Sequence, residues 1–323
     1  MSLLTKLPLE FYDHGAFAGF AAGSDFSLGN GKSQIWLSQL AYETDEPDKI
    51  ATILQFWGLR LAQPGIFFAE IRTALPIAST HGFVAAGRGA TFVSFAGTDP
   101  VVLANWISDF DARIDKDTQI ADGYETAANA VAEQVRQAIS DPALSGNKIY
   151  VTGHSLGGAL AVVTALHLQS SGTNVEAVYT FGMPRAGSPA FATGYNSALG
   201  ARSYRLVDAD DLVPTVAPSD LDFHHVGRIL RCQRGGRFDP NKLAADTTSD
   251  EPNFVAGVSK ELRDFLQGPL SGMSAPLAQL KLALTAAAGG GPAGVRTDVA
   301  GLVIELLPPR LRDHMTDRYI AAF

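Results

Sequence analysis

The sequence predicts an α/β fold in which helices cover both faces of a mainly parallel sheet, and three observations support this prediction. Short apolar segments typical of buried strands alternate with helical segments along much of the chain. Hydrophobic residues make up 46% of the 323 residues and charged residues 18%, which is typical of a globular protein with a sizeable core. One predicted strand also passes directly into a helix, at a serine flanked by glycines in "VTGHSLGGALA" (residues 151–161). We expect residues 1–323 to form a single domain.

The individual elements follow from periodicity and turn residues. Residues 34–63 are predicted to be helical, because Ile50, Ile53 and Leu54 recur at three- and four-residue steps. The segments "HGFVAAG" and "ATFVSFAG" predict two strands that are joined by the turn "GRG". The remaining predicted elements are a helix over 124–139, a strand over 148–153, a helix over 156–169, and strands over 175–182, 202–208 and 227–232.

Composition excludes several classes of function. The net charge of −8 argues against binding to nucleic acid, which requires a basic surface. The single cysteine, Cys232, allows no internal disulfide, and no cluster of Cys and His indicates a metal site or a cofactor. No segment has the length of continuous apolar sequence that a membrane span requires, and residues 1–17 do not resemble a signal peptide. The compartment therefore remains open, either cytoplasmic or reached by an export route that this sequence does not reveal.

The glycines around Ser155 predict a nucleophilic serine. A strand that turns at once into a helix must make a tight bend, and Gly153 and Gly157 remove side chains that would collide there. Ser155 would then project alone beyond the sheet at the N-terminus of a helix, where negative charge is favoured. The backbone N–H of Leu156 is in a position to receive the charge of an oxyanion. A serine can also simply cap a helix, but the position between a strand and a helix favours the nucleophile.

A nucleophilic serine needs a base, and the base needs an acid that orients it. In hydrolases with this motif the chain order is Ser, then Asp or Glu, then His. His154 is expected to point away from the serine, because side chains alternate along a strand. The candidates for the acid are the carboxylates that follow the strand over 202–208, and the candidates for the base are the later histidines. They are Asp208, Asp210 and Asp211 for the acid, and His224, His225 and His314 for the base.

These residues resemble the class 3 lipases, which are α/β-hydrolases related to fungal triacylglycerol lipases. The resemblance covers most of residues 34–232 and the C-terminus. The segments that carry it are "LAYE", "FVSFAGT", "NWISDF", "DGYETA", "VTGHSLGGALA", "TFGMPRAG", "RLVDADDLVP", "FHHVG" and "DHMTDRY". Two positions depart from the family pattern, which usually has Arg at Ala96 and often has His at Ala121.

The resemblance implies an α/β-hydrolase fold and a role for individual residues. It implies Ser155 as the nucleophile, Asp211 as the acid and His314 as the base, with His225 as a structural residue and the alternative base. It also implies the backbone N–H of Thr98 as a second donor to the oxyanion, besides that of Leu156. Because His314 lies near the end of the chain, the Ala-, Gly- and Leu-rich residues at about 240–310 would be an insertion or cap within the same domain.

The function that follows is hydrolysis of carboxylic esters, by a lipase that acts on acylglycerols, and an oil–water interface is a candidate place for this reaction. A feruloyl esterase or a phospholipase with the same three residues is an alternative, and a non-catalytic binding module is another. Residues 98–110 and 255–300 are candidates for a segment that covers the site. Acyl-chain length, stereopreference and oligomeric state do not follow from the sequence.

Overall fold

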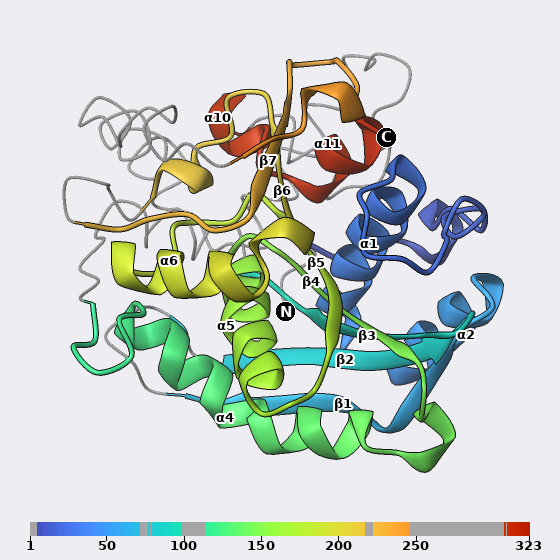
Figure 1. The fold of residues 1–323 in the computed structure, drawn as a ribbon. Helices are drawn as coiled ribbons and strands as arrows, with labels where there is room; N and C mark the ends of the chain where they lie inside the picture. The colour runs from blue at the N-terminus through green and yellow to red at the C-terminus, as the bar shows by residue number, and fades with distance from the viewer. Residues whose placement is uncertain are drawn as a thin grey trace, which may run out of the picture.

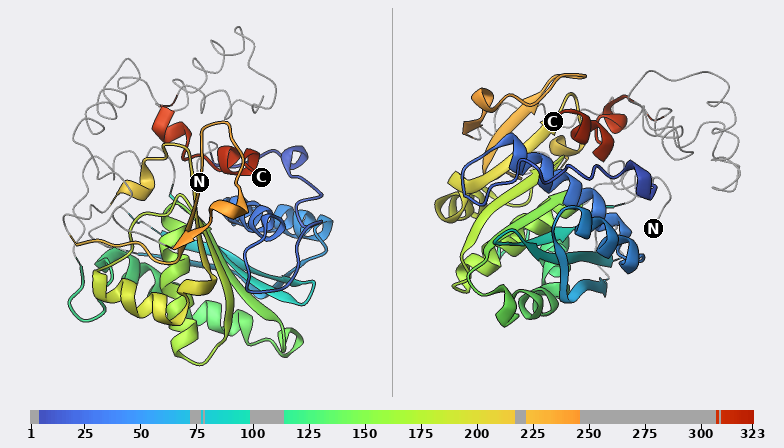
Figure 2. Two further views of the ribbon diagram at one scale, coloured as in Figure 1. Left: turned by 45° about the horizontal axis from the view of Figure 1, so that its top comes forward. Right: turned by 90° about the vertical axis from the view of Figure 1, so that its right-hand side faces the viewer.

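The computed structural model describes residues 5–71, 77, 79–98, 114–216, 222–245, 307 and 309–323. In this part of the chain, an eight-stranded sheet carries helices on both faces (Figures 1 and 2). The strands are β1 (Arg60–Glu70), β2 (Ser79–Gly87), β3 (Ala90–Phe95), β4 (Lys148–His154), β5 (Val175–Phe181), β6 (Ser203–Asp208), β7 (Arg228–Cys232) and β8 (Ala244–Ala245). The α-helices are α1 (Leu28–Leu40), α2 (Pro47–Phe56), α4 (Asp122–Ile139), α5 (Leu156–Ser170), α6 (Pro189–Ala198), α10 (Pro309–Arg312) and α11 (Thr316–Ala321). Short 3₁₀ helices are η1 (Leu9–Phe11), η2 (Ala41–Glu43), η3 (Pro142–Leu144), η4 (Gly200–Arg202), η5 (Val213–Thr215) and η7 (Pro240–Lys242).

The strands lie in the sheet in the order of the sequence, from β1 to β8. Neighbours from β3 to β7 are parallel, whereas β1, β2 and β3 pair antiparallel, as do β7 and β8. The predicted mainly parallel sheet is therefore confirmed, with antiparallel strands at its two sides. Because β3 to β7 run in one direction, their carboxyl ends meet at one edge of the sheet, which is where catalytic groups gather in such folds.

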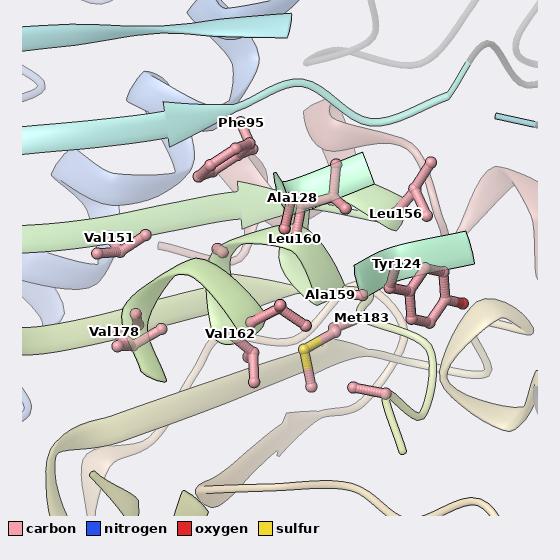
Figure 3. Packing of buried hydrophobic residues seen from close by; sticks show 14 of the residues in the cluster. Phe95, Tyr124, Ala128, Val151, Leu156, Ala159, Leu160, Val162, Val178 and Met183 are labelled. Carbon is pink, nitrogen blue, oxygen red and sulfur yellow. The ribbon is translucent and has the colours of Figure 1, made fainter. Parts of the chain in front are cut away.

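Two apolar cores, one on each face, hold the helices to the sheet. On one face α4 packs against β1 and β2, and α5 packs against β3, β4 and β5. Figure 3 shows this packing, with Phe95 and Val151 from the strands against Leu160 from α5 and Ala128 from α4. On the other face α1 packs against β4 and β5, and α2 packs against β1 (Figure 1). The predicted coverage of both faces is thus confirmed.

The predicted helix over 34–63 is wrong, because two helices and the start of a strand occupy these residues. Helix α1 begins earlier, where the side chain of Ser27 accepts a hydrogen bond from the Asn30 N–H, and it ends at Leu40. Pro47 then starts α2, and Gly58, at a φ of 71°, turns the chain into β1. The register of β1 against β2 shifts between Leu61 and Ile66, which interrupts the alternating pattern of a strand. The other predicted strands and helices agree with the structure within two residues at each end.

The C-terminal segment returns to the body of the protein. Helix α11 packs against α1 and β6, which brings the end of the chain to the carboxyl edge of the sheet (Figure 2). The predicted insertion at about 240–310 lies outside the described residues except for η7, β8, Leu307 and the start of α10. Among the described residues, we find no helix that combines the length and the apolar character needed to cross a membrane.

Candidate active site

Ser155 lies at the junction of β4 and α5 in a strained backbone conformation. Its φ of 58° and ψ of −133° are rarely adopted by residues other than glycine. A Cβ on Gly153 would lie 2.1 Å from the carbonyl oxygen of Gly157, and one on Gly157 would lie 2.6 Å from that of Phe95. Both glycines are therefore required by close backbone contacts, as the sequence predicted. The N–H of Ser155 donates to the carbonyl of Phe181 at 2.8 Å, which fixes the bend to the neighbouring strand β5.

The structure brings together His314 and Asp211, which lie 103 positions apart in the sequence. The Nδ1 atom of His314 lies 3.0 Å from Oδ1 and 2.9 Å from Oδ2 of Asp211. Because a carboxylate only accepts hydrogen bonds, Nδ1 carries the proton and Nε2 of a neutral ring has a free lone pair. Both side chains are buried. Neither Nε2 of His314 nor the buried Oγ of Ser155 has a hydrogen-bond partner among the described residues.

Gly182 makes room for this pair. It follows β5, and a Cβ at this position would lie 2.6 Å from Oδ2 of Asp211 and 2.8 Å from Nδ1 of His314. Its φ of 58° is also one that glycine adopts most readily. The N–H of Ser155 is hydrogen-bonded to Phe181, the residue before Gly182. The carboxylate of Asp211, the imidazole of His314 and Ser155 therefore all lie around the end of β5.

Two further donors hold the carboxylate of Asp211, and the sequence analysis assigned neither of them a role. The N–H of Val213 donates to Oδ1 at 2.8 Å, and the hydroxyl of Tyr319 in α11 donates to Oδ2 at 2.6 Å. Burial and then the neighbouring Asp211 raise the pKa of Tyr319 well above its usual range, so its hydroxyl remains a donor. Tyr319 lies in the segment "DHMTDRY", five positions after His314, and its place in this segment was the available signal.

The structure distinguishes the three candidate carboxylates. Asp210 has an exposed side chain that faces Arg234. Asp208 is buried against Cys232, whose thiol donates to Oδ1 at 2.9 Å. Burial raises the pKa of Asp208 to about 6, and burial and then Asp208 raise that of the Cys232 thiol to about 12. Of the three, Asp211 is the carboxylate that contacts a candidate base.

The other candidate histidines have different surroundings. His225 is buried, and its Nε2 lies 2.8 Å from the carbonyl oxygen of Pro214, an arrangement that ties down the loop after Asp211. This geometry agrees with the structural role that the resemblance implied for His225. The backbone of His224 forms an isolated antiparallel β-bridge with Gly187. Of these histidines, His314 is the one that an ion pair or hydrogen bond joins to Asp211.

The two predicted oxyanion donors lie on chain segments next to Ser155. Leu156 is the first residue of α5, so its N–H has no acceptor within the helix. Thr98 is half-buried and follows Gly97, whose added Cβ would lie 3.0 Å from Cβ of Ser155. The loop that carries Thr98 therefore passes directly over the serine. The candidate cover segments lie outside the described residues, apart from Thr98 itself.

An ion-pair cluster joins the chain segments that carry Asp211 and His314. The guanidinium of Arg234 lies 2.6 Å from Oδ2 of Asp313, the residue before His314, and 3.2 Å from Oδ2 of Asp210. The side chain of Asp313 is 4% exposed, whereas that of Arg234 is 50% exposed. Within the described residues, no group of three or more His, Cys, Asp or Glu side chains could hold a metal ion.

The fold and the strained serine at the junction of β4 and α5 define an α/β-hydrolase. Solved structures agree with the fold. A mono- and diacylglycerol lipase from Aspergillus oryzae matches with a TM-score of 0.58 and 20% identity, over 75% of this chain and 94% of that chain. A lipase from Rhizopus microsporus var. chinensis matches with a TM-score of 0.55 and 21% identity, over 75% and 88%.

Residues 92–221 match the family described as Lipase (class 3). A "Secreted mono- and diacylglycerol lipase 1" of Fusarium solani is 35% identical over 146 residues, which are 43% of this chain and 42% of that protein. A "Lipase" of Rhizomucor miehei is 30% identical over 164 residues, 47% of this chain and 44% of that protein. Residues 92–221 thus resemble the class 3 lipase family, and the matches cover less than half of this chain and less than half the length of these two relatives.

Proposed function

We propose that this protein is a serine ester hydrolase that cleaves acylglycerols through an acyl-enzyme on Ser155. The observation that carries this proposal is the pairing of His314 with Asp211, together with two buried atoms that lack partners among the described residues. These atoms are Nε2 of His314 and Oγ of Ser155. Buried polar atoms are normally hydrogen-bonded, so an atom without a partner requires an explanation, and a catalytic role is one such explanation. The match of residues 92–221 to the class 3 lipases supports the same reaction.

In the first half of the reaction, Oγ of Ser155 attacks the carbonyl carbon of the ester while its proton passes to Nε2 of His314. The carboxylate of Asp211 keeps the proton on Nδ1 and stabilises the imidazolium. The negative charge on the former carbonyl oxygen is received by the N–H groups of Leu156 and Thr98. The low dielectric of a buried site strengthens these interactions, and each oxyanion donor lowers the barrier by about 3–4 kcal/mol.

The tetrahedral intermediate then collapses. The bond between the acyl carbon and the alcohol oxygen breaks, and the proton on Nε2 of His314 passes to the departing alcohol. Water enters next and gives its proton to the same nitrogen while its oxygen attacks the acyl-enzyme. A second collapse returns the proton to Ser155 and releases the carboxylic acid, so the enzyme is regenerated.

The relatives support an acylglycerol as the substrate. The Fusarium solani relative is named as a mono- and diacylglycerol lipase, and the Aspergillus oryzae structure is that of a mono- and diacylglycerol lipase. We therefore place partial glycerides ahead of feruloyl esters and phospholipids as substrates. The same Fusarium solani relative is named as secreted, which supports export of this protein as well.

Covalent labelling of the purified full chain tests the proposed nucleophile. A fluorophosphonate probe, followed by mass mapping, is expected to modify the peptide that contains Ser155. Ser155→Ala should lower kcat on monobutyrin by at least about 10⁴-fold while the chain still folds, because the nucleophile is lost. Ser171→Ala, an exposed serine at the other end of α5, serves as the control and should keep full activity. Equal turnover by wild type and Ser155→Ala would contradict the assignment.

Substrate profiling separates the alternatives. We expect monoacylglycerols and diacylglycerols to be hydrolysed with a higher kcat/KM than methyl ferulate or phosphatidylcholine, because the family relatives are named for partial glycerides. A preference for either of the other two esters would replace the acylglycerol by that substrate. Wild-type protein that is inert toward all of them and toward the fluorophosphonate would instead indicate a binding module.

A further inference from the structure

His154 is a buried titratable side chain that the reaction above does not use. It is the last residue of β4, directly before Ser155, and it is 2% exposed. Both of its ring nitrogens have a partner. Nδ1 lies 2.8 Å from the hydroxyl oxygen of Tyr42 in η2, and Nε2 lies 2.7 Å from the backbone carbonyl oxygen of His314. The His154 ring thus connects Tyr42, near the N-terminal end of the chain, with the predicted base His314.

The partners determine where the proton lies on this ring. A backbone carbonyl can only accept a hydrogen bond, so Nε2 of His154 donates to His314. Burial and then the neighbouring His314 hold the pKa of His154 well below its usual range, and the ring is therefore neutral. A neutral imidazole has one N–H, so Nδ1 of His154 accepts the hydroxyl proton of Tyr42. The hydrogen bonds run in one direction, from Tyr42 through His154 to His314.

The titratable groups that face the His154 ring are Tyr42, His314 and Tyr319. The centroids of the His154 and His314 rings lie 4.5 Å apart with an angle of 31° between the planes, and the Tyr319 ring lies 5.8 Å away. His314 becomes an imidazolium during acyl transfer. A second positive charge at this distance would oppose that step, whereas a neutral ring does not.

The same hydrogen bonds lie beneath the loop that carries Thr98. A Cβ on Gly97 would lie 2.3 Å from the hydroxyl oxygen of Tyr42 and 2.6 Å from the carbonyl oxygen of His154. The Tyr42–His154 pair is therefore in contact with the backbone of the loop that passes over Ser155. Movement of His154 would disturb the position of the base and of an oxyanion donor together.

We propose that His154, in the tautomer with a proton on Nε2 and held by Tyr42, positions the backbone of His314 so that its Nε2 faces Ser155. This inference rests on the proposed function, because it takes His314 as the base. His154 acts through another residue and does not touch the substrate. It is therefore a positioning residue.

Substitutions at His154 test this role by separating kcat from KM. His154→Leu removes the donor to the His314 carbonyl and should lower kcat per folded molecule by about 100-fold, with KM changed by less than about twofold. His154→Gln supplies an amide N–H near the position of Nε2 and should recover at least about tenfold of this loss. A residue needed only for folding would lower the melting temperature without this rescue.

The matched control is His167→Gln on the same strand–helix unit. His167 lies near the C-terminal end of α5, where its Nε2 is 3.3 Å from a carboxylate oxygen of Glu125. This variant should keep the wild-type kcat. A kcat of His154→Leu within about threefold of wild type, or equal losses for the Leu and Gln variants, would overturn the proposal.

A second measurement does not depend on activity or on any variant. In ¹⁵N NMR spectra of the full chain labelled at histidine, His154 should show the neutral tautomer with the proton on Nε2 from about pH 8 to about pH 5. Titration of His154 in this range, or a proton on Nδ1, would overturn the inference even if the protein is an active esterase. A wild-type chain without esterase activity but with this tautomer would overturn the proposed function and with it the positioning role, while the hydrogen bonds would stand.

Discussion

Gly182→Ala is the substitution that most directly tests the geometry of the site. The added methyl group would lie 2.6 Å from Oδ2 of Asp211 and 2.8 Å from Nδ1 and Cε1 of His314, whereas ordinary contact begins at about 3.4 Å. Both side chains must move by roughly half an ångström or more, because both contacts lie below 3.0 Å. A shift of Asp211 strains its hydrogen bonds from the Val213 N–H and the Tyr319 hydroxyl, and a shift of His314 displaces the predicted base.

The loss of stability expected for Gly182→Ala has two contributions, one from backbone strain and one from side-chain crowding. The φ of 58° at Gly182 costs alanine about 1–2 kcal/mol, part of which is offset because alanine restricts the unfolded chain. Crowding the buried pair adds about 1–3 kcal/mol of lost stability. A displacement of the base relative to Ser155 by a fraction of an ångström to one ångström should lower kcat by about 100-fold.

The assay is kcat on monobutyrin together with urea unfolding, with Gly172→Ala as the control. Gly172 follows α5 at a φ of 88°, and an added Cβ would meet no atom within 4 Å. This control therefore imposes the same kind of backbone strain without contact with the site. We expect it to lose about 1 kcal/mol of stability and to keep the wild-type kcat.

The reasoning would be refuted by a Gly182→Ala protein whose kcat lies within about threefold of wild type and whose stability equals that of Gly172→Ala. In that case the methyl group would have found space, and Asp211 and His314 could not be packed against the end of β5 as the structure has them.

Two further predictions concern the acidic residues around the site. Arg234→Ala should lower kcat a few-fold and stability by about 1 kcal/mol at low salt, because it leaves the buried carboxylate of Asp313 without the Arg234 cation. The control is Arg237→Ala, at an exposed arginine. Equal losses of stability for the two variants in urea unfolding would contradict this prediction. The pKa of Asp208 is raised by burial from its ordinary 3.8 to about 6, so the folded state binds this proton more tightly and the stabilisation is lost as the pH rises through about 6. The stability of Asp208→Asn relative to wild type should therefore improve by about 2 kcal/mol between pH 4 and pH 8 in thermal unfolding, and a constant difference would argue against the shift.

The parallel strands β3, β4 and β5 were predictable because they are largely buried on both faces and form mostly apolar runs. Helix α1 was harder to place, because its buried side includes polar residues such as Ser38, whose hydroxyl lies 3.0 Å from that of Thr152 in β4. Hydrophobic periodicity does not detect such a helix. Helix α6 was missed, although the Ser188 cap and Pro189 at its first position mark its start.

In the candidate site, too, some residues were predictable from the sequence and others were not. The position of Ser155 at a bend between a strand and a helix was predictable because the strand, the bend and the helix are adjacent in sequence. Its partners are distant, and the choice of Asp211 rested on the family resemblance and not on any property of the local sequence. The hydrogen bond between Tyr42 and His154 joins residues 112 positions apart, and no pattern in the sequence relates them. Such contacts depend on which helix packs against which strand, and that follows only from the three-dimensional arrangement.

The four aspartates near His314 have different surroundings, and these distinguish Asp211 from the other three. In the proposed reaction an imidazolium forms at His314, and a buried negative charge beside it is stabilising only where other donors also satisfy the carboxylate. Asp208 has a raised pKa and a thiol donor, Asp313 is paired with Arg234, and Asp210 is exposed to water. Asp211 has no cationic partner among the described residues other than His314, and its oxygens accept hydrogen bonds from the Tyr319 hydroxyl and the Val213 N–H. The buried carboxylate without a permanent counter-ion thus lies beside the ring on which the proposed acyl transfer would place a transient positive charge.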